Sequence, residues 1–185
     1  MKKVLAVLMG VMGISAAMAG DEPFQLSLTP DIAIYDRSDR IDGLTLSIWG
    51  ENPQSSLAIG VVNGTTGNSV GLCVGIVNYA DNYKGLQWGL VNYTDANTEG
   101  WQGGFCLGLL GSVVNYTGGT LTGFQCGVVN YAGDLNGFQL GFVNIADKAK
   151  GGLQIGIVNI MPENEWFSKM PNELAPGMII ANWHF

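Results

Sequence analysis

The side chains best able to do chemistry are scarce in this chain, and their spacing fits no familiar catalytic site. His184 is the only histidine and immediately precedes the C-terminal Phe185. This excludes a His-based triad and a histidine metal cluster. Glycines are abundant, but no Gly-Lys-Ser or Gly-Lys-Thr sequence marks a phosphate-binding loop. We therefore expect no enzymatic activity and neither a cofactor nor a metal.

A group of carboxylates near the N-terminus is the other candidate for ligand binding. Aspartates recur at every third position from Asp36 to Asp42, and Asp31 lies nearby. Calcium favours such oxygens, but Arg37 and Arg40 lie among them and no Gly-bearing calcium loop follows. We interpret the segment as a solvated turn that neutralises its own charge.

The three cysteines, Cys73, Cys106 and Cys126, lie in no Cys-x-x-Cys spacing. One interpretation is that they are small buried hydrophobic residues. The other is one disulfide with a leftover thiol. The sequence leaves their oxidation state open.

A short phrase repeated through the chain is far more informative than any single residue. It consists of Gly, two or three apolar residues and Asn, usually followed by an aromatic residue. The Asn positions are separated by 15, 14, 23, 15, 14 and 15 residues, which is typical of a repeat architecture. The structural repeat positions are Gly60, Asn63, Gly75, Asn78, Gly89, Asn92, Asn115, Gly127, Asn130, Gly141, Asn144, Gly156 and Asn159.

The phrases are rich in Val, Ile, Leu and aromatic residues, whereas the segments between them contain turn formers and almost all the charges. This pattern predicts short strands. Strand periodicity of two would place Leu86, Trp88 and Leu90 on a bulky face and Gln87 on a smaller one, neither with any charge. The expected strands are 24–35, 43–50, 56–64, 71–79, 85–93, 100–116, 123–131, 137–145, 152–160 and 176–185.

Two all-β architectures hide both faces of such strands. In a small antiparallel outer-membrane β-barrel, one face meets lipid and the other fills the lumen. In a single-stack β-solenoid, each repeat forms one coil and identical residues stack into Gly columns and Asn ladders. We favour the barrel, with about ten strands built from 14–15-residue repeats. The alternating Ile179, Ala181, Trp183 and Phe185 resemble the C-terminal assembly signal of outer-membrane barrels.

The N-terminus has the features of a secretory signal peptide. Lys2 and Lys3 precede an apolar run, and Ala17-Met18-Ala19 provides small residues for cleavage after Ala19. We predict a signal peptide over 1–19 and one repeat-built β domain over 20–185. The exported chain would keep six basic and fifteen acidic residues, a formal charge of −9. That charge argues against nucleic acid as a partner.

Two features of the phrases have more than one interpretation. The motif Asn side chains could pair with one another or with backbone, or they could form a row that binds a ligand. The aromatic residues could form a membrane-interface girdle or pack as in ordinary strands.

The tandem GLQ-x-G-x-VN phrases, the signal peptide and the aromatic C-terminus resemble those of the leptospiral-type bacterial surface-repeat family. The resemblance covers residues from about 43 to 160 and the terminal NWHF. It implies an exported surface or outer-membrane protein of a Gram-negative bacterium and supplies no catalytic residues.

Three functions remain open from the sequence. The first is a non-enzymatic outer-membrane or cell-surface protein with a structural or small-pore role, in contact with outer-membrane lipid and the barrel-assembly machinery. The second is a surface-attached solenoid that presents a flat face for adhesion or ligand binding. The third is a small barrel enzyme that acts on envelope lipids through Ser, Asp or Tyr chemistry.

Overall fold

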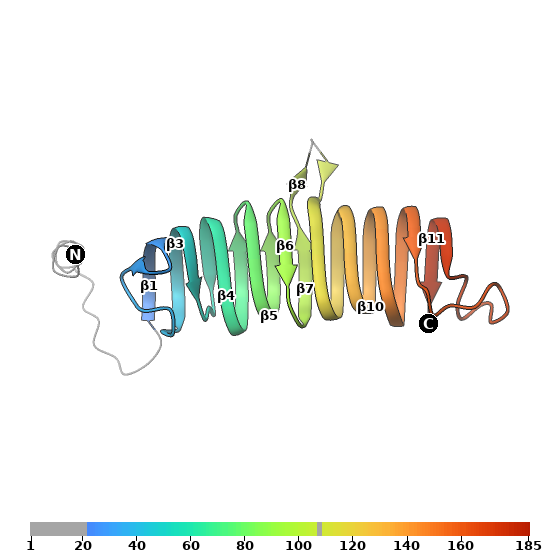
Figure 1. The fold of residues 1–185 in the computed structure, drawn as a ribbon, viewed down its shortest axis with the longest axis horizontal. Coiled ribbons are helices and arrows are strands. Elements are labelled where there is room, and N and C mark those ends of the chain that lie inside the picture. The colour runs from blue at the N-terminus through green and yellow to red at the C-terminus, as the bar shows by residue number, and fades with distance from the viewer. Residues whose placement is uncertain (1–21, 107–108) are drawn as a thin grey trace.

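Successive repeat phrases lie side by side in parallel, because the chain winds into a stack of β-coils (Figure 1). The computed structural model describes residues 22–106 and 109–185. Asn63 pairs with Asn78, Asn78 with Asn92, and Asn92 with Asn115, each one repeat further along the chain. Each repeat is therefore one coil, and its neighbours in sequence are its neighbours in space.

The strands run for most of each coil. They are β1 (Glu22–Thr29), β2 (Ile32–Ala33), β3 (Ile41–Asn52), β4 (Leu57–Val74), β5 (Val77–Trp88), β6 (Val91–Thr94), β7 (Thr98–Gly103), β8 (Phe105–Cys106), β9 (Leu109–Leu110), β10 (Ser112–Ile160) and β11 (Gly177–His184). The main sheet has the order β11-β10-β6-β5-β4-β3-β1-β2, and β7 pairs with both β5 and β10. The 49-residue β10 winds through several coils without a break.

The predicted all-β class is confirmed, but the predicted antiparallel barrel is wrong. Parallel pairing joins β1 to β3, β3 to β4, β4 to β5 and β5 to β6, and it continues from β6 and β7 to β10. Among the described strands of the main sheet, only β2 and β11 pair antiparallel, and each lies at an end of the stack. The arrangement is the alternative, a single-stack solenoid. The physical reason is that in-register parallel pairing places every repeat position beside its own equivalent.

The expected two-faced strand is wrong as well, because each phrase bends at its glycine. Gln87 and Asn92 are both fully buried although they are five residues apart, an odd number that strict alternation would place on opposite faces. Gly89 and Leu90, between them, lie outside the strands. The bend resets the alternation, so one strand turns Gln inward and the next turns Asn inward.

The 23-residue gap between motif Asn residues is one coil with an insertion, rather than the predicted long strand over 100–116. Gln102 pairs with Gln125 and Asn92 pairs with Asn115, so the coil closes normally on both sides of the insertion. Between them β8 and β9 form an antiparallel hairpin that stands away from the stack (Figure 1). Gly111 N–H donates to the Gly104 carbonyl at 2.5 Å and closes the base of the hairpin.

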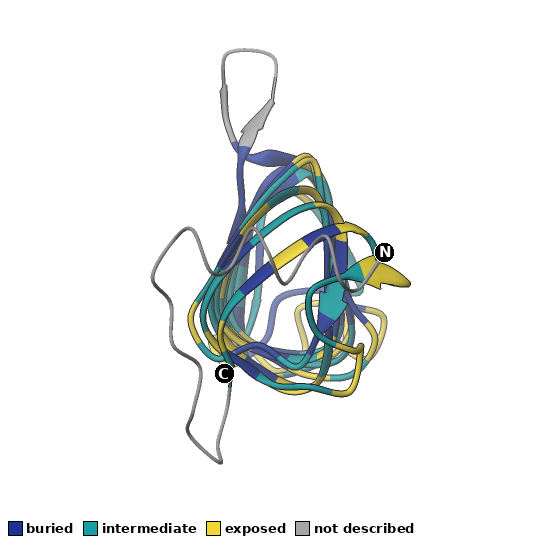
Figure 2. Ribbon diagram, turned by 90° about the vertical axis from the view of Figure 1, so that its left-hand side faces the viewer, coloured by how far each residue is buried: buried dark blue, intermediate teal, exposed yellow. Residues whose placement is uncertain are grey.

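The apolar core inside the coils is small. Leu121, Ala132, Leu135, Ala146 and Met161 form one buried cluster in the C-terminal half. In the N-terminal half, Ala58, Cys73, Ala80 and Tyr83 form another. Buried, intermediate and exposed residues are all found around the coils (Figure 2). Most of the other buried side chains are amides and hydroxyls.

A column of glycines forms one corner of the stack. Gly71, Gly85, Gly100, Gly123 and Gly137 all have φ between +125° and +156°. A Cβ atom at Gly100 would collide with the carbonyl of Gly85 on the preceding coil. Glycine is therefore required twice over, by the left-handed conformation and by the close approach of the coils.

We predict that deletion of residues 104–111 leaves the fold intact. The deletion joins Gly103 to Ser112 and restores a 15-residue spacing from Asn92 to the next motif Asn. Circular dichroism should keep its strand signal, and the melting temperature should change by only a few degrees. Deletion of 127–134, an equal length, removes a motif Gly and Asn and should abolish cooperative unfolding. Loss of the strand signal and of cooperative unfolding in both deletions would contradict the interpretation of residues 104–111 as an insertion into one coil.

Candidate functional site

The seven motif Asn residues form a continuous hydrogen-bonded column inside the stack, here named the Asn ladder. Each amide nitrogen except that of Asn159 donates to the Oδ1 atom of the Asn on the next coil, at 2.8–2.9 Å, and Asn159 donates to the Gly156 carbonyl. All seven are at most 2 % exposed. The members are Asn63, Asn78, Asn92, Asn115, Asn130, Asn144 and Asn159. Enclosed and bonded to one another, these side chains are not available as the ligand-binding row that the sequence left open.

The Asn ladder also explains why six of the seven phrases contain a glycine three residues before their Asn, the exception being Ser112 before Asn115. The Asn130 amide donates to the backbone carbonyl of Leu140 at 2.9 Å and thereby lies against Gly141 of the next coil. A Cβ atom at Gly141 would lie about 2.5 Å from the Asn130 amide nitrogen. Gly75, Gly89, Gly127 and Gly156 meet the Asn of the preceding coil in the same way. Gly and Asn of the phrase are thus two halves of one contact between coils.

A second column, the Gln ladder, runs through the same interior and was missed as a site by sequence reasoning. It consists of Gln87, Gln102, Gln125, Gln139 and Gln154, all fully buried. Each amide nitrogen donates to Oε1 of the preceding coil, at 2.7–2.8 Å. The signal was present in the recurring Gln of the GLQ lead-in, but the alternation placed these residues only on the smaller face of a strand, and the repeat positions taken from the phrase were Gly and Asn alone.

The two ladders point in opposite directions. The Asn amides donate toward the C-terminal end of the stack, whereas the Gln amides donate toward the N-terminal end. Backbone acceptors fix both senses: Asn144 donates to the Ile155 carbonyl at 3.0 Å, and Gln125 donates to the Tyr131 carbonyl at 3.0 Å. If both columns pointed the same way, their amide dipoles would add. Because they point in opposite directions, the dipoles of the two columns cancel.

The Gln ladder ends where its sequence pattern ends. On the coil before Gln87, the equivalent position is Cys73. The Gln87 amide nitrogen and the Gln154 amide oxygen, at the two ends, have no hydrogen-bond partner among the described residues. These are the donor of the first ladder member and the acceptor of the last, and each points away from the other members along the stack. Every bond between neighbouring members is made, so the ladder is satisfied everywhere except at its ends.

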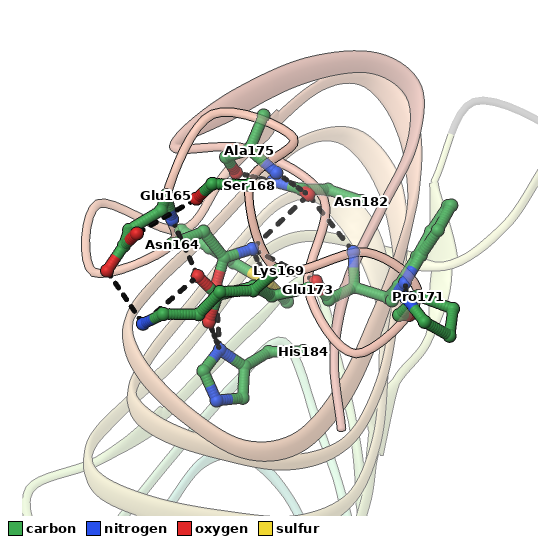
Figure 3. A network of polar contacts seen from close by, with 11 residues as sticks. Asn164, Glu165, Ser168, Lys169, Pro171, Glu173, Ala175, Asn182 and His184 are labelled. Carbon is green, nitrogen blue, oxygen red and sulfur yellow. Dashed lines mark hydrogen bonds and ion pairs between the residues drawn. The ribbon is translucent and has the colours of Figure 1, made fainter.

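The C-terminal residues predicted as an assembly signal form a cap over the last coil. β11 pairs antiparallel with the end of β10, placing Trp183 opposite Leu153 and Ala181 opposite Ile155. Ile179 and Phe185 are each 68 % exposed. The Trp183 indole N–H donates to the Pro171 carbonyl at 2.8 Å (Figure 3). This alternation therefore belongs to a closing strand, and its recognition by an assembly machinery stays a prediction.

A polar network holds this cap in place (Figure 3). The Asn182 amide donates to the Ala175 carbonyl at 2.8 Å, and the Asn164 amide donates to the Trp183 carbonyl at 2.9 Å. Glu173 is only 4 % exposed, and one of its oxygens accepts from the Glu165 backbone N–H at 2.8 Å. His184 Nδ1 lies 2.7 Å from Asn164 Oδ1 and 3.3 Å from a Glu173 oxygen. The single histidine thus contacts the cap.

The N-terminal carboxylates are paired within their own region. Arg37 lies 3.1 Å from Asp31 and 3.4 Å from Glu51. The Asp36 backbone N–H donates to Asp39 at 3.0 Å. In residues 22–106 and 109–185, no group of three or more His, Cys, Asp or Glu side chains is placed to share a metal ion.

The tyrosines that follow the motif Asn residues stack on one another along the outside of the coils. Ring centroids are 4.9 Å apart for Tyr93 and Tyr116 and 4.8 Å apart for Tyr116 and Tyr131, with nearly parallel planes. The Tyr131 hydroxyl donates to Asp147 at 2.6 Å, and this hydrogen bond is the main reason that its pKa rises to about 12. These tyrosines form a packed ladder rather than the rings of a membrane girdle.

The main surface feature is a charge-free strip that flanks the motif glycines, here named the apolar face. It consists of exposed apolar residues immediately before or after those glycines; Cys126, which precedes Gly127, is buried and does not belong to it. Exposed members are Ile59, Val61, Ile76, Leu90, Leu140, Phe142, Ile155 and Ile157, with exposed fractions of 38–62 %. Monomeric proteins seldom leave a continuous apolar strip of this kind uncovered.

Comparison of the chain with protein-family models, curated proteins and solved structures finds no match. The resemblance to surface-repeat proteins therefore depends on the repeat phrases and stays a prediction. Residues 22–106 and 109–185 include no helix with the length and apolar character needed to cross a membrane.

We predict that Asn130→Ala destabilises the protein by about 3–5 kcal/mol. The substitution removes bonds to Asn115, Asn144 and the Leu140 carbonyl, and it leaves buried polar atoms without partners at about 1–3 kcal/mol each. Urea unfolding measures the change. Asn136→Ala makes the same substitution at an exposed position in the same coil and should cost at most about 0.5 kcal/mol. Similar losses for the two variants would contradict the role of the Asn ladder.

We also predict that the Cys73 thiol is inert in the folded protein. Cys73 is a free thiol, and its burial raises its pKa to about 11, so little thiolate forms near neutral pH. Iodoacetamide at about pH 8 should leave Cys73 unmodified in the native protein and alkylate it fully in urea, as measured by peptide mass spectrometry. Rapid alkylation of the native protein at this residue would show that the coil opens there.

Proposed function

We propose that this protein is an exported, non-enzymatic structural solenoid that attaches to the outer membrane or cell surface through its apolar face. The observation that carries the proposal is the combination of an interior closed by two amide ladders with an uncovered strip of aliphatic residues outside. The signal peptide predicted over residues 1–19, outside the described part of the chain, supports export.

The inside of the stack supports a structural role rather than a role in transport. Its polar groups bond to one another between coils, so they do not converge on a space that a substrate could occupy. What differs from an ordinary soluble repeat protein is the outside, where one corner carries aliphatic residues along the coils from Ile59 to Ile157. Burial of apolar surface is the main source of affinity that such a corner can provide.

The distribution of charge supports the same orientation. Ion pairs such as Lys84–Glu99 and Lys150–Asp134 lie in parts of the coils that are remote in sequence from the motif glycines. The molecule therefore has one side suited to water and one suited to an apolar partner. Outer-membrane lipid, predicted as a partner from the sequence, fits this division. Because β11 is a cap rather than a barrel strand, we do not extend the proposal to the barrel-assembly machinery.

Cell fractionation with face variants tests this proposal. The native protein should stay with the envelope through a wash at about 1 M salt, because apolar contacts are not screened by ions. Ile59→Ser combined with Ile76→Ser, on the N-terminal half of the apolar face, should shift most of the protein to the soluble fraction. Both residues are exposed, at 42 % and 50 %, so the fold should survive.

Val70→Ser is the matched control, since Val70 is 40 % exposed but lies on another side of the coil, beside Lys84. It should leave attachment unchanged. Recovery of the native protein in the soluble fraction, or release by salt alone, would overturn the proposed function.

A further inference from the structure

The C-terminal half of the apolar face contains a groove with a glycine floor, here named the glycine groove. Gly127, Gly141 and Gly156 form the floor, Leu140 and Ile155 form one wall, and Phe142 and Ile157 line the other. The cavity has a volume of about 720 Å³, within the range of small-molecule sites. Glycine is imposed here by the Asn ladder inside, so the groove outside is a consequence of the packing within.

The glycine groove offers its occupant almost nothing to hydrogen-bond. The carbonyls of Leu140 and Ile155 already accept from Asn130 and Asn144. Ser112, at one end, turns its hydroxyl inward, where it donates to the Gly89 carbonyl at 2.8 Å and accepts from Asn92. A peptide strand needs main-chain partners when it binds to a sheet, and this floor has none to give. The chemistry that fits is a hydrocarbon chain.

The C-terminal end of the groove is closed by a strained residue. Ile180 has φ of 70°, a conformation that β-branched residues rarely adopt, and it lies opposite Gly156 where the register shifts. Ile179 and Ile180 both line the groove and are 68 % and 73 % exposed. From Ser112 to Ile180 the groove crosses four strand spacings, or about 19 Å. It is thus a slot of limited length, bounded by a wall at one end.

The charge around the groove restricts the polar end of the occupant. None of the described residues that line it is charged, and the sequence from Thr120 to Gly133 contains no charge. The whole chain has a formal charge of −7. Interfacial proteins that bind anionic lipids surround their apolar surface with Lys and Arg, which this groove lacks. A head group without net negative charge is therefore favoured.

We propose that the glycine groove binds the acyl chain of a zwitterionic membrane lipid. This inference depends on the proposed function, because it names the partner of the same apolar face. A second copy of the chain is the competing occupant. It is disfavoured because Ile179 and Ile180 project at one end and would hold a flat, rigid partner away from the floor, whereas a flexible chain can lie beneath them.

Binding of single-chain lysophosphatidylcholine, measured by calorimetry below its micelle concentration, tests the proposal. One molecule should bind per protein. Affinity should rise by about two- to fourfold per added CH₂ from decanoyl upward and then level off once the chain fills the slot. Lysophosphatidylglycerol of equal chain length should bind more weakly. No binding, or affinity that never levels off with chain length, would overturn the proposal.

Variants of the groove sharpen the test. Phe142→Ser with Ile157→Ser should reduce affinity by about tenfold, and Val70→Ser should not change it. Ile180→Gly removes the end wall at a position whose φ suits glycine, so it should fold normally and move the plateau to longer chains. If affinity levels off at the same chain length in Ile180→Gly as in the native protein, the groove is not a slot that Ile180 closes.

Two further results separate this inference from its alternatives. A dimer in sedimentation velocity that the groove variants dissociate and the lipid does not would identify a second copy as the occupant and overturn the inference. Alternatively, substitution of Ile59 and Ile76 could abolish envelope attachment while the groove variants stay attached and the native protein binds no lysolipid. That result would support the proposed function and refute the acyl-chain site.

Discussion

The contact on which the rest of the structure depends is the fit of each motif Asn against the glycine of the next coil. At Gly75, Gly89, Gly127, Gly141 and Gly156 a Cβ atom would collide with the amide of the preceding Asn, whereas the small Ser112 accepts a hydrogen bond from Asn92. That requirement fixes the distance between coils, the register of their pairing and the parallel direction of the strands. One contact, repeated at five coils between Asn63 and Gly156, thereby sets the architecture.

The same contact explains why the molecule carries its large apolar side chains outside. Amide columns occupy two sides of a narrow interior, which leaves room for only a few small or medium apolar residues such as Leu121 and Ala146. Most apolar residues beside the motif glycines are exposed, although Cys126 is buried. The apolar face thus lies outside the Asn ladder, and exposed apolar patches of this kind are typical of interaction sites.

The sequence predicts the repeat, the strands and the special status of Gly and Asn, because these follow from composition and period. It does not predict how neighbouring strands pair, since an antiparallel barrel and a parallel solenoid can share one charge-free alternating pattern. Two details obscured the difference. The bend at Gly89 reverses the alternation within a phrase, and the terminal aromatic residues of a capping strand resemble those of a barrel strand. The Gln ladder was missed because the repeat positions taken from the phrase were Gly and Asn, without the Gln that precedes them.

The distance between spin labels at Val61→Cys and Ile157→Cys, in a chain whose native cysteines are alanine, tests the stacked arrangement most directly. Both positions follow a motif glycine and are separated by six coils, so electron paramagnetic resonance should give roughly 29 Å, six strand spacings. Removal of residues 128–141, one coil, joins Gly127 to Phe142 and should shorten the distance to roughly 24 Å while the protein stays folded. An unchanged distance, or loss of folding on removal of one coil, would contradict the account.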